Sequence, residues 1–162
     1  MSYLFLKYLH LLSLVILVGT GLGSAWYKWM GDRSDDLAGI VRINTLVVQA
    51  DWFFTTPAII LQPLTGLGMV HIQGLPLDSP WIAASLFLYG LAAACWLPVV
   101  WLQIRMRDLS RTALATDQRL PERYQSYARY WFWLGVPAFV CMTAIIFLMV
   151  FKPDAGLGIC RI

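Results

Sequence analysis

Charged residues are scarce in this sequence, and four long stretches contain none. Asp, Glu, Lys and Arg make up 13% of the 162 residues, whereas a typical soluble domain carries about 25%. The uncharged stretches cover 20 residues after Lys7, 26 after Asp51, 26 after Asp78 and 22 after Arg129. A helix needs about 20 apolar residues to cross a bilayer. The pattern therefore excludes a soluble globular domain and a disordered chain, and it also excludes barrel strands of about 10 residues.

Cysteine and histidine are also rare, which removes several classes of site. The three cysteines show no CxxC spacing, so we interpret them as small apolar residues rather than as a disulfide framework. Two histidines without a Cys/His pattern argue against a structural zinc site. The chain has no P-loop and no glycine motif within a βαβ unit, which argues against a nucleotide site. The net charge of +3 comes from arginines beside apolar runs, so no nucleic-acid partner is predicted.

The apolar runs predict an all-α integral membrane protein with a single transmembrane domain over 1–162. Backbone polar groups inside a bilayer must be satisfied within the protein, and an antiparallel four-helix bundle is the simplest arrangement that does so. We expect helices over about residues 3–29, 44–71, 80–105 and 127–151. Polar loops are expected at 31–42 and 106–126, followed by a short tail at 152–162.

Basic residues are concentrated around the first and third connections between these helices. Nine of the twelve lie there: Lys28, Arg33, Arg42, Arg105, Arg107, Arg111, Arg119, Arg123 and Arg129. Loops rich in Lys and Arg remain in the cytoplasm. We therefore expect a multi-pass protein of a bacterial inner membrane, with both long loops in the cytoplasm and both termini outside.

Two of the expected helices contain residues that should shape their packing. The second helix contains Pro57 and Pro63, each of which removes a backbone donor and favours a kink. The first helix contains Gly19 and Gly23, a GxxxG spacing that permits close approach of another helix. Lys28, near the end of the first helix among aromatic residues, is expected to extend its charge to the membrane surface.

His10 is the first candidate for chemistry. It lies three residues after Lys7, so the two side chains share a helix face. An ionisable residue inside a membrane is expensive and usually faces the bundle interior. His10 is therefore interpreted either as a ligand or proton relay, or as a neutral histidine that is hydrogen-bonded to a neighbouring helix.

Four residues of the second helix are further candidates. His71 lies at its outer end, where it is either a second ligand or a solvated helix terminus. Asp51 is either a functional carboxylate or an interfacial one that pairs with Lys28, Arg42 or Arg129. Gln62 and Thr65 lie three residues apart and form either a polar seam or a helix-packing contact.

The N-terminal segment YLFLKYLHLLSLVILVGTGL resembles the start of the HemJ-type protoporphyrinogen oxidases, which are small four-helix membrane proteins. The segment TTPAIILQPLTGLGMV is similar to that family's proline-containing second span, and the final helix ending in Lys152-Pro153 looks like its last one. The same layout resembles more closely a sister group of bacterial predicted integral membrane proteins of unknown function.

The HemJ resemblance implies an oxidoreductase with heme b, in which His10 is the iron ligand. The lysine that this family carries at the start of its third helix has no counterpart here, where the sequence reads PWIAASLFLYG. Two other functions stay open. One is a non-enzymatic accessory or assembly protein that docks a partner. That partner is either a further copy of the chain, in a homo-oligomer, or a membrane redox protein. The other is a small transporter or proton pathway that uses Lys7, His10 and Asp51.

Overall fold

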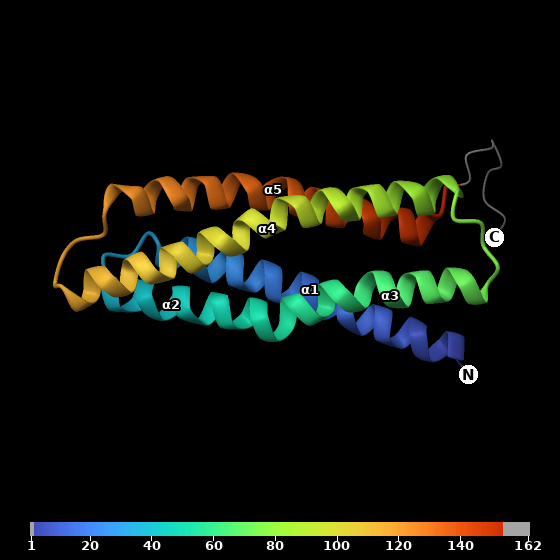
Figure 1. Ribbon diagram of the computed structural model, residues 1–162, viewed down its shortest axis with the longest axis horizontal. Helices are drawn as coiled ribbons and strands as arrows, with labels where there is room; N and C mark the ends of the chain where they lie inside the picture. Colours follow the sequence, from blue (N-terminus) through green and yellow to red (C-terminus); the bar gives the residue numbers. More distant parts are fainter. Residues whose placement is uncertain (1, 154–162) are drawn as a thin grey trace.

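The protein is a bundle of four long helical segments, each long and apolar enough to cross a membrane. The computed structural model describes residues 2–153, so the tail from 154, with Cys160 and Arg161, lies outside the described residues. The four candidate spans are α1 (Ser2–Gly31), the continuous segment α2 (Leu37–Ala50), η1 (Asp51–Thr55) and α3 (Thr56–Ile72), then α4 (Pro80–Ala115) and α5 (Glu122–Phe151). The predicted four-helix membrane bundle is confirmed (Figure 1).

The helices are longer than the sequence pattern indicates, and both expected polar loops shrink. The predicted loop 106–126 is a six-residue connection at 116–121, because α4 continues to Ala115 and α5 begins at Glu122. The extension of α4 buries Met106, Ser110 and Ala113, which follow the spacing of one helix face. The expected loop 31–42 likewise reduces to 32–36. Charged residues end the membrane-compatible stretch, but they do not end the helix.

The second span is interrupted next to its first proline. Five residues, Asp51–Thr55, form one turn of π-helix between α2 and α3. The Asp51 carbonyl accepts the backbone N–H of Thr56 and also its hydroxyl, the latter at 2.8 Å. Pro57 follows directly and has no N–H to continue the regular ladder. The predicted disturbance is therefore a π-turn, a feature found frequently at functional sites.

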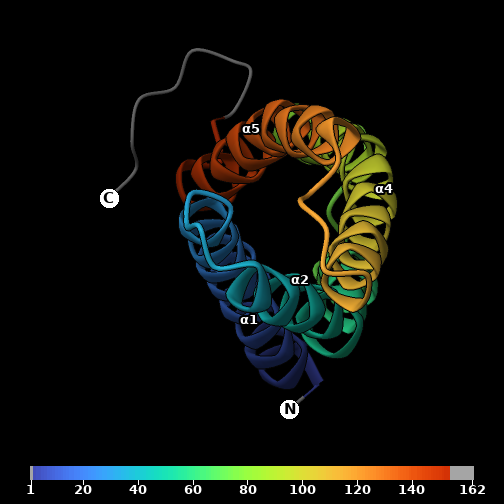
Figure 2. The same cartoon turned by 90° about the vertical axis from the view of Figure 1, so that its left-hand side faces the viewer.

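The helices pack as two layers that join most tightly at one end. α1 packs on α3 and α2, α4 packs on α5, and α2 packs on α4. Figure 2 shows α1 and α2 on one side of the bundle and α4 and α5 on the other. In the described part of the chain, α1 and α5 make at most marginal contact. The end of the bundle formed by the connections 32–36 and 116–121 is called the basic end below.

The close approach of α1 to another helix does not use its GxxxG motif. A Cβ added at Gly19 or Gly23 would meet nothing within 4 Å. The tight contact lies on α3 instead, where a Cβ at Gly66 would come within 3.3 Å of the His10 ring and one at Gly68 within 3.1 Å of Leu6. The expectation for Gly19 and Gly23 is therefore wrong. The glycines of α3 let α1 approach closely, and they place His10 against α3.

Candidate functional site

His10, Gln62 and Thr65 form one hydrogen-bonded group between α1 and α3. His10 Nδ1 lies 2.9 Å from the Thr65 hydroxyl oxygen, and Gln62 donates its side-chain N–H to the His10 carbonyl at 3.2 Å. The Thr65 hydroxyl also lies 2.6 Å from the Leu61 carbonyl and 3.2 Å from the Gln62 carbonyl, and it can donate to either. When it does so, Nδ1 is the donor to Thr65 and Nε2 keeps its lone pair. Gln62 and Thr65 therefore both bond to His10 across the contact between α1 and α3, Thr65 to the ring and Gln62 to the backbone.

The other two members of the expected site do not join this group. Lys7 and His71 are both exposed, and no described contact connects either of them to His10. No cluster of three or more His, Cys, Asp or Glu residues that could hold a metal occurs in residues 2–153. The described residues therefore bring no second histidine to His10.

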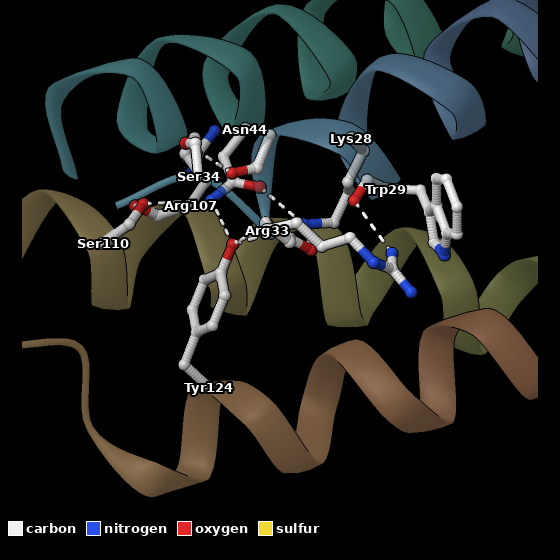
Figure 3. Close-up of polar contacts among 10 residues, drawn as sticks. Lys28, Trp29, Arg33, Ser34, Asn44, Arg107, Ser110 and Tyr124 are labelled. Atoms are coloured by element: carbon white, nitrogen blue, oxygen red, sulfur yellow. Dashed lines mark hydrogen bonds and ion pairs between the residues drawn. The ribbon is translucent and has the colours of Figure 1, made fainter. Parts of the chain in front are cut away.

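A second polar group, which sequence reasoning missed, lies buried at the basic end. This basic-end cluster consists of Lys28, Asp32, Asn44, Ser110 and Tyr124. The Lys28 ammonium donates to both Asp32 carboxylate oxygens at 2.9 and 3.1 Å, to the Asn44 carbonyl at 2.8 Å and to the Tyr124 hydroxyl at 3.3 Å. Figure 3 shows the Tyr124 hydroxyl reaching from α5 toward Asn44 and Lys28. Four helices contribute to the cluster: Lys28 comes from α1, Asn44 from α2, Ser110 from α4 and Tyr124 from α5, and Asp32 directly follows α1.

Lys28 does not extend to the membrane surface as expected. Its side chain is 0% exposed, because Asp32 and Asn44 supply its charge and hydrogen-bond partners inside the bundle. Asn44 also donates to Ser110 at 3.2 Å and to Tyr124 at 2.9 Å. The spacing of Lys28 and Asp32, four residues apart, indicates an ion pair. Asn44, Ser110 and Tyr124 come from distant segments and carry no such signal.

A cavity with a volume of about 740 Å³ lies between the two layers. Its wall comes from α1, from η1 and the start of α3, from α4 and from α5, and it is almost entirely apolar. Four tryptophans contribute to it: Trp26, Trp29, Trp96 and Trp131. Several lining residues are also exposed on the outside of the bundle, including Leu22 and Trp26 on α1 and Phe139 and Val140 on α5. The cavity is therefore a groove that opens sideways between α1 and α5.

Three buried polar side chains in the cavity wall are incompletely bonded, and they are called the cavity rim. Asp51 is 5% exposed, Gln103 5% and Trp131 8%. The Thr55 hydroxyl donates to Asp51 Oδ1 at 2.9 Å, whereas Asp51 Oδ2, Gln103 Oε1 and Trp131 Nε1 have no hydrogen-bond partner. Asp51 forms no ion pair among the described residues, so the expected pairing with Lys28, Arg42 or Arg129 is wrong.

The π-turn places the Asp51 carboxylate in this wall. Thr55, at the other end of the turn, also lines the cavity and occupies one of the two carboxylate oxygens. Tyr89 of α4 donates its hydroxyl to the Ile59 carbonyl of α3, which ties the two layers together beside the cavity. His10 is not part of this wall. The group around His10 and the cavity are therefore separate sites, and only Asp51 belongs both to the expected candidates and to the cavity.

The sequence of this four-span chain matches one protein family along nearly its whole length. The family model described as predicted integral membrane protein (DUF2269) matches residues 4–153. The chain belongs to this family. Comparison with curated proteins gives no match, and comparison with solved structures gives none either. DUF2269 membership establishes an integral membrane protein in contact with the lipid bilayer, and the function has to be argued from the geometry.

Proposed function

We propose that this DUF2269 protein binds a small apolar molecule that is dissolved in the membrane. The observation that carries the proposal is the cavity of about 740 Å³ inside a four-span bundle. Pockets of roughly 300–1,000 Å³ with mostly apolar walls are typical of small-molecule sites.

The route of entry is the gap between α1 and α5. These helices make at most marginal contact in the described residues, yet together they supply most of the cavity wall. A ligand can therefore enter from the bilayer without crossing the aqueous phase. Because lipid tails are as apolar as the wall, burial alone gives little selectivity, and shape and polar contacts must supply it. Aromatic side chains favour a flat or aromatic ligand body.

The test compares two glycines of α1 that lie two residues apart. Gly21 lines the cavity and Gly19 does not, and a Cβ at either position meets nothing within 4 Å. The probe is 1-bromododecane in nanodiscs, and the readout is saturable quenching of tryptophan fluorescence. Gly21→Leu fills part of the cavity, so we expect roughly tenfold weaker binding, while Gly19→Leu binds as wild type does. Quenching that never saturates, or that is identical in the two variants, contradicts the proposal.

Heme b at His10 is a second proposal, supported by one geometric feature. Thr65 lies within hydrogen-bond distance of His10 Nδ1, which leaves Nε2 free to bind iron when Nδ1 carries the proton, as in ligating histidines whose other nitrogen is hydrogen-bonded. The purified protein should then show a Soret band that His10→Ala removes and Thr65→Val weakens. His71→Ala serves as the control, since His71 is exposed and apart. A colourless protein that takes up no hemin contradicts this proposal.

We also infer that the basic end faces the cytoplasm, because nine of the twelve basic residues lie around its connections. In a cysteine-free background, Asp78→Cys and Gln118→Cys place single thiols at opposite ends of the bundle. A membrane-impermeant maleimide added to intact bacteria should label Asp78→Cys, and it should label Gln118→Cys only after permeabilisation. The reverse pattern contradicts the inferred orientation.

The accessory-protein and proton-pathway alternatives stay predictions, and no described contact joins Lys7, His10 and Asp51.

A further inference from the structure

The cavity rim indicates which polar group the ligand carries. We propose that the ligand is an amphiphile whose polar head is a hydroxyl group, bound by Asp51, Gln103 and Trp131. This inference rests on the proposed function, since it concerns the occupant of the same cavity. It goes further by naming the chemical class of the head group and the side chains that distinguish it from other heads.

The first step is the distribution of unpaired polar atoms. In residues 2–153, the buried side-chain atoms without a hydrogen-bond partner are Asp51 Oδ2, Gln103 Oε1 and Trp131 Nε1. All three belong to residues that line the cavity, and each residue is more than nine-tenths buried. Buried polar groups in proteins are normally paired, so unpaired ones need an explanation. Their concentration in a single cavity points to a partner that binds there.

The second step is the kind of partner these atoms need. Two of them are oxygens that accept a hydrogen bond, and the indole Nε1–H of Trp131 is a donor with no acceptor function. An ammonium head offers donors but nothing for the indole to donate to. An ether, ester or ketone head offers acceptors but no donor. A hydroxyl group offers one donor and two acceptor lone pairs, so it can donate to one of the two oxygens while it accepts from the indole.

The third step concerns the charge of the head group. Lys28, the buried cation near the rim, is already paired with Asp32 and bonded to Asn44. Thr55 donates to one oxygen of Asp51, which is the type of contact that a second hydroxyl on the other oxygen would repeat. A hydroxyl can donate to Asp51 when it is ionised and accept from it when it is protonated. The rim can therefore hold a neutral head group in either state of the carboxyl.

The test uses three probes with the same tail and different heads: 4-nonylphenol, 4-nonylanisole and nonylbenzene. Each competes with 1-bromododecane for the wild-type protein in nanodiscs, with concentrations expressed relative to lipid after measured partitioning. We expect nonylphenol to bind about tenfold more tightly than nonylbenzene, because it gains more than one buried hydrogen bond. Nonylanisole, which accepts but cannot donate, should lie between them. This comparison needs no variant, so it does not depend on whether a mutant folds.

Two variants with matched controls then assign the bonds. Trp131→Phe removes the donor, so binding of nonylphenol and nonylanisole should weaken about threefold to tenfold while nonylbenzene is unaffected. Gln103→Leu removes an acceptor, so only nonylphenol should weaken. The controls are Trp133→Phe, an exposed tryptophan on the same helix, and Gln62→Leu, a buried glutamine outside the cavity. Both controls should keep the wild-type order of the three probes.

The outcomes separate this inference from the proposed function. If all three probes compete equally well after correction for partitioning, the cavity binds apolar molecules without reading the head, and this inference is overturned. Water that fills the rim would give that same result. If none of the three competes and quenching by 1-bromododecane does not saturate, the proposed function itself fails. A head-group preference that survives both Trp131→Phe and Gln103→Leu also overturns the assignment of these side chains.

Discussion

The basic-end cluster and the cavity rim are both buried polar groups, and they differ in how completely their atoms are paired. The members of the basic-end cluster bond to one another across four helices, and none of their buried polar side-chain atoms is unpaired. Asp51, Gln103 and Trp131 instead leave one atom each without a partner. Polar networks that are fully satisfied specify a structure, whereas unsatisfied atoms indicate strain or a missing ligand.

Trp131 belongs to the cavity rim and also contacts the basic-end cluster. Its ring lies 5.5 Å from the Lys28 ammonium, while its indole belongs to the cavity wall. The Lys28 ammonium also lies 5.4 Å from the ring of Tyr124. A cation held over an aromatic face is stabilised by the ring quadrupole. The basic-end cluster therefore fixes the position of a ring that the cavity uses, and the two regions divide into a scaffold and a site.

The largest loss of stability is expected when the buried ammonium of Lys28 is removed from the basic-end cluster. Lys28→Met leaves Asp32 without its cation and Asn44 without its donor. Breaking one side of a buried pair destabilises by about 3–5 kcal/mol, and because the Asp32 side chain is 16% exposed we expect roughly 3 kcal/mol. The measurement is unfolding of the detergent-solubilised protein by denaturant. Lys7→Met, at an exposed lysine of the same helix, is the control and should change stability little.

The basic-end cluster would lose its status as the scaffold if Lys28→Met and Lys7→Met were equally stable. The double variant Lys28→Met with Asp32→Leu gives an internal check. Replacing both partners by apolar residues removes the uncompensated charge, so part of the lost stability should return.

A smaller effect is expected from the hydroxyl of Tyr124. Tyr124→Phe leaves the ring in place and removes a group that contacts Lys28, Asp32 and Asn44. Loss of a buried hydrogen-bonding group destabilises by roughly 1–3 kcal/mol, and we expect about 2 kcal/mol here. Tyr130→Phe changes an exposed tyrosine of the same helix and should be neutral in the same unfolding assay. Equal losses in the two variants would mean that the hydroxyl network contributes nothing.

The sequence predicts the scaffold of this protein better than its site. Long uncharged runs predict the four spans because the bilayer demands about 20 apolar residues from each. Pro57 locates the disturbance in the second span, whereas Pro63 lies inside the continuous helix α3. His10, Gln62 and Thr65 are recognisable because polar residues in an apolar run must find partners. The ends of the helices are not recognisable in this way, since α4 and α5 extend beyond the uncharged runs into segments that contain charged residues.

The cavity rim cannot be predicted from the sequence, and the reason is geometric. Asp51 stands out as a carboxylate in an apolar span, but Gln103 and Trp131 look like an ordinary helix polar residue and an interfacial aromatic. Their meeting depends on how α4 and α5 rotate about their axes and on the separation of α5 from α1. Those quantities follow from side-chain packing across the whole bundle. A one-residue rotation would turn Gln103 away from the cavity without changing any periodicity in the sequence.

The last test compares the same type of substitution, Asp→Asn, in the two regions, where it should change stability in opposite directions. Asp51→Asn keeps the shape of the side chain but removes a carboxylate that lacks a partner on one oxygen. Removing an unsatisfied buried charge relieves a desolvation penalty, so we expect the ligand-free protein to gain about 1 kcal/mol. Asp32→Asn, in the basic-end cluster, should instead lose stability because it unpairs Lys28.

Functional sites commonly trade stability for binding, so Asp51→Asn should also weaken the binding of nonylphenol while leaving the binding of nonylbenzene unchanged. If Asp51→Asn destabilises as much as Asp32→Asn does, the carboxylate at the π-turn is a structural group like the basic-end cluster, and the distinction between scaffold and site does not hold.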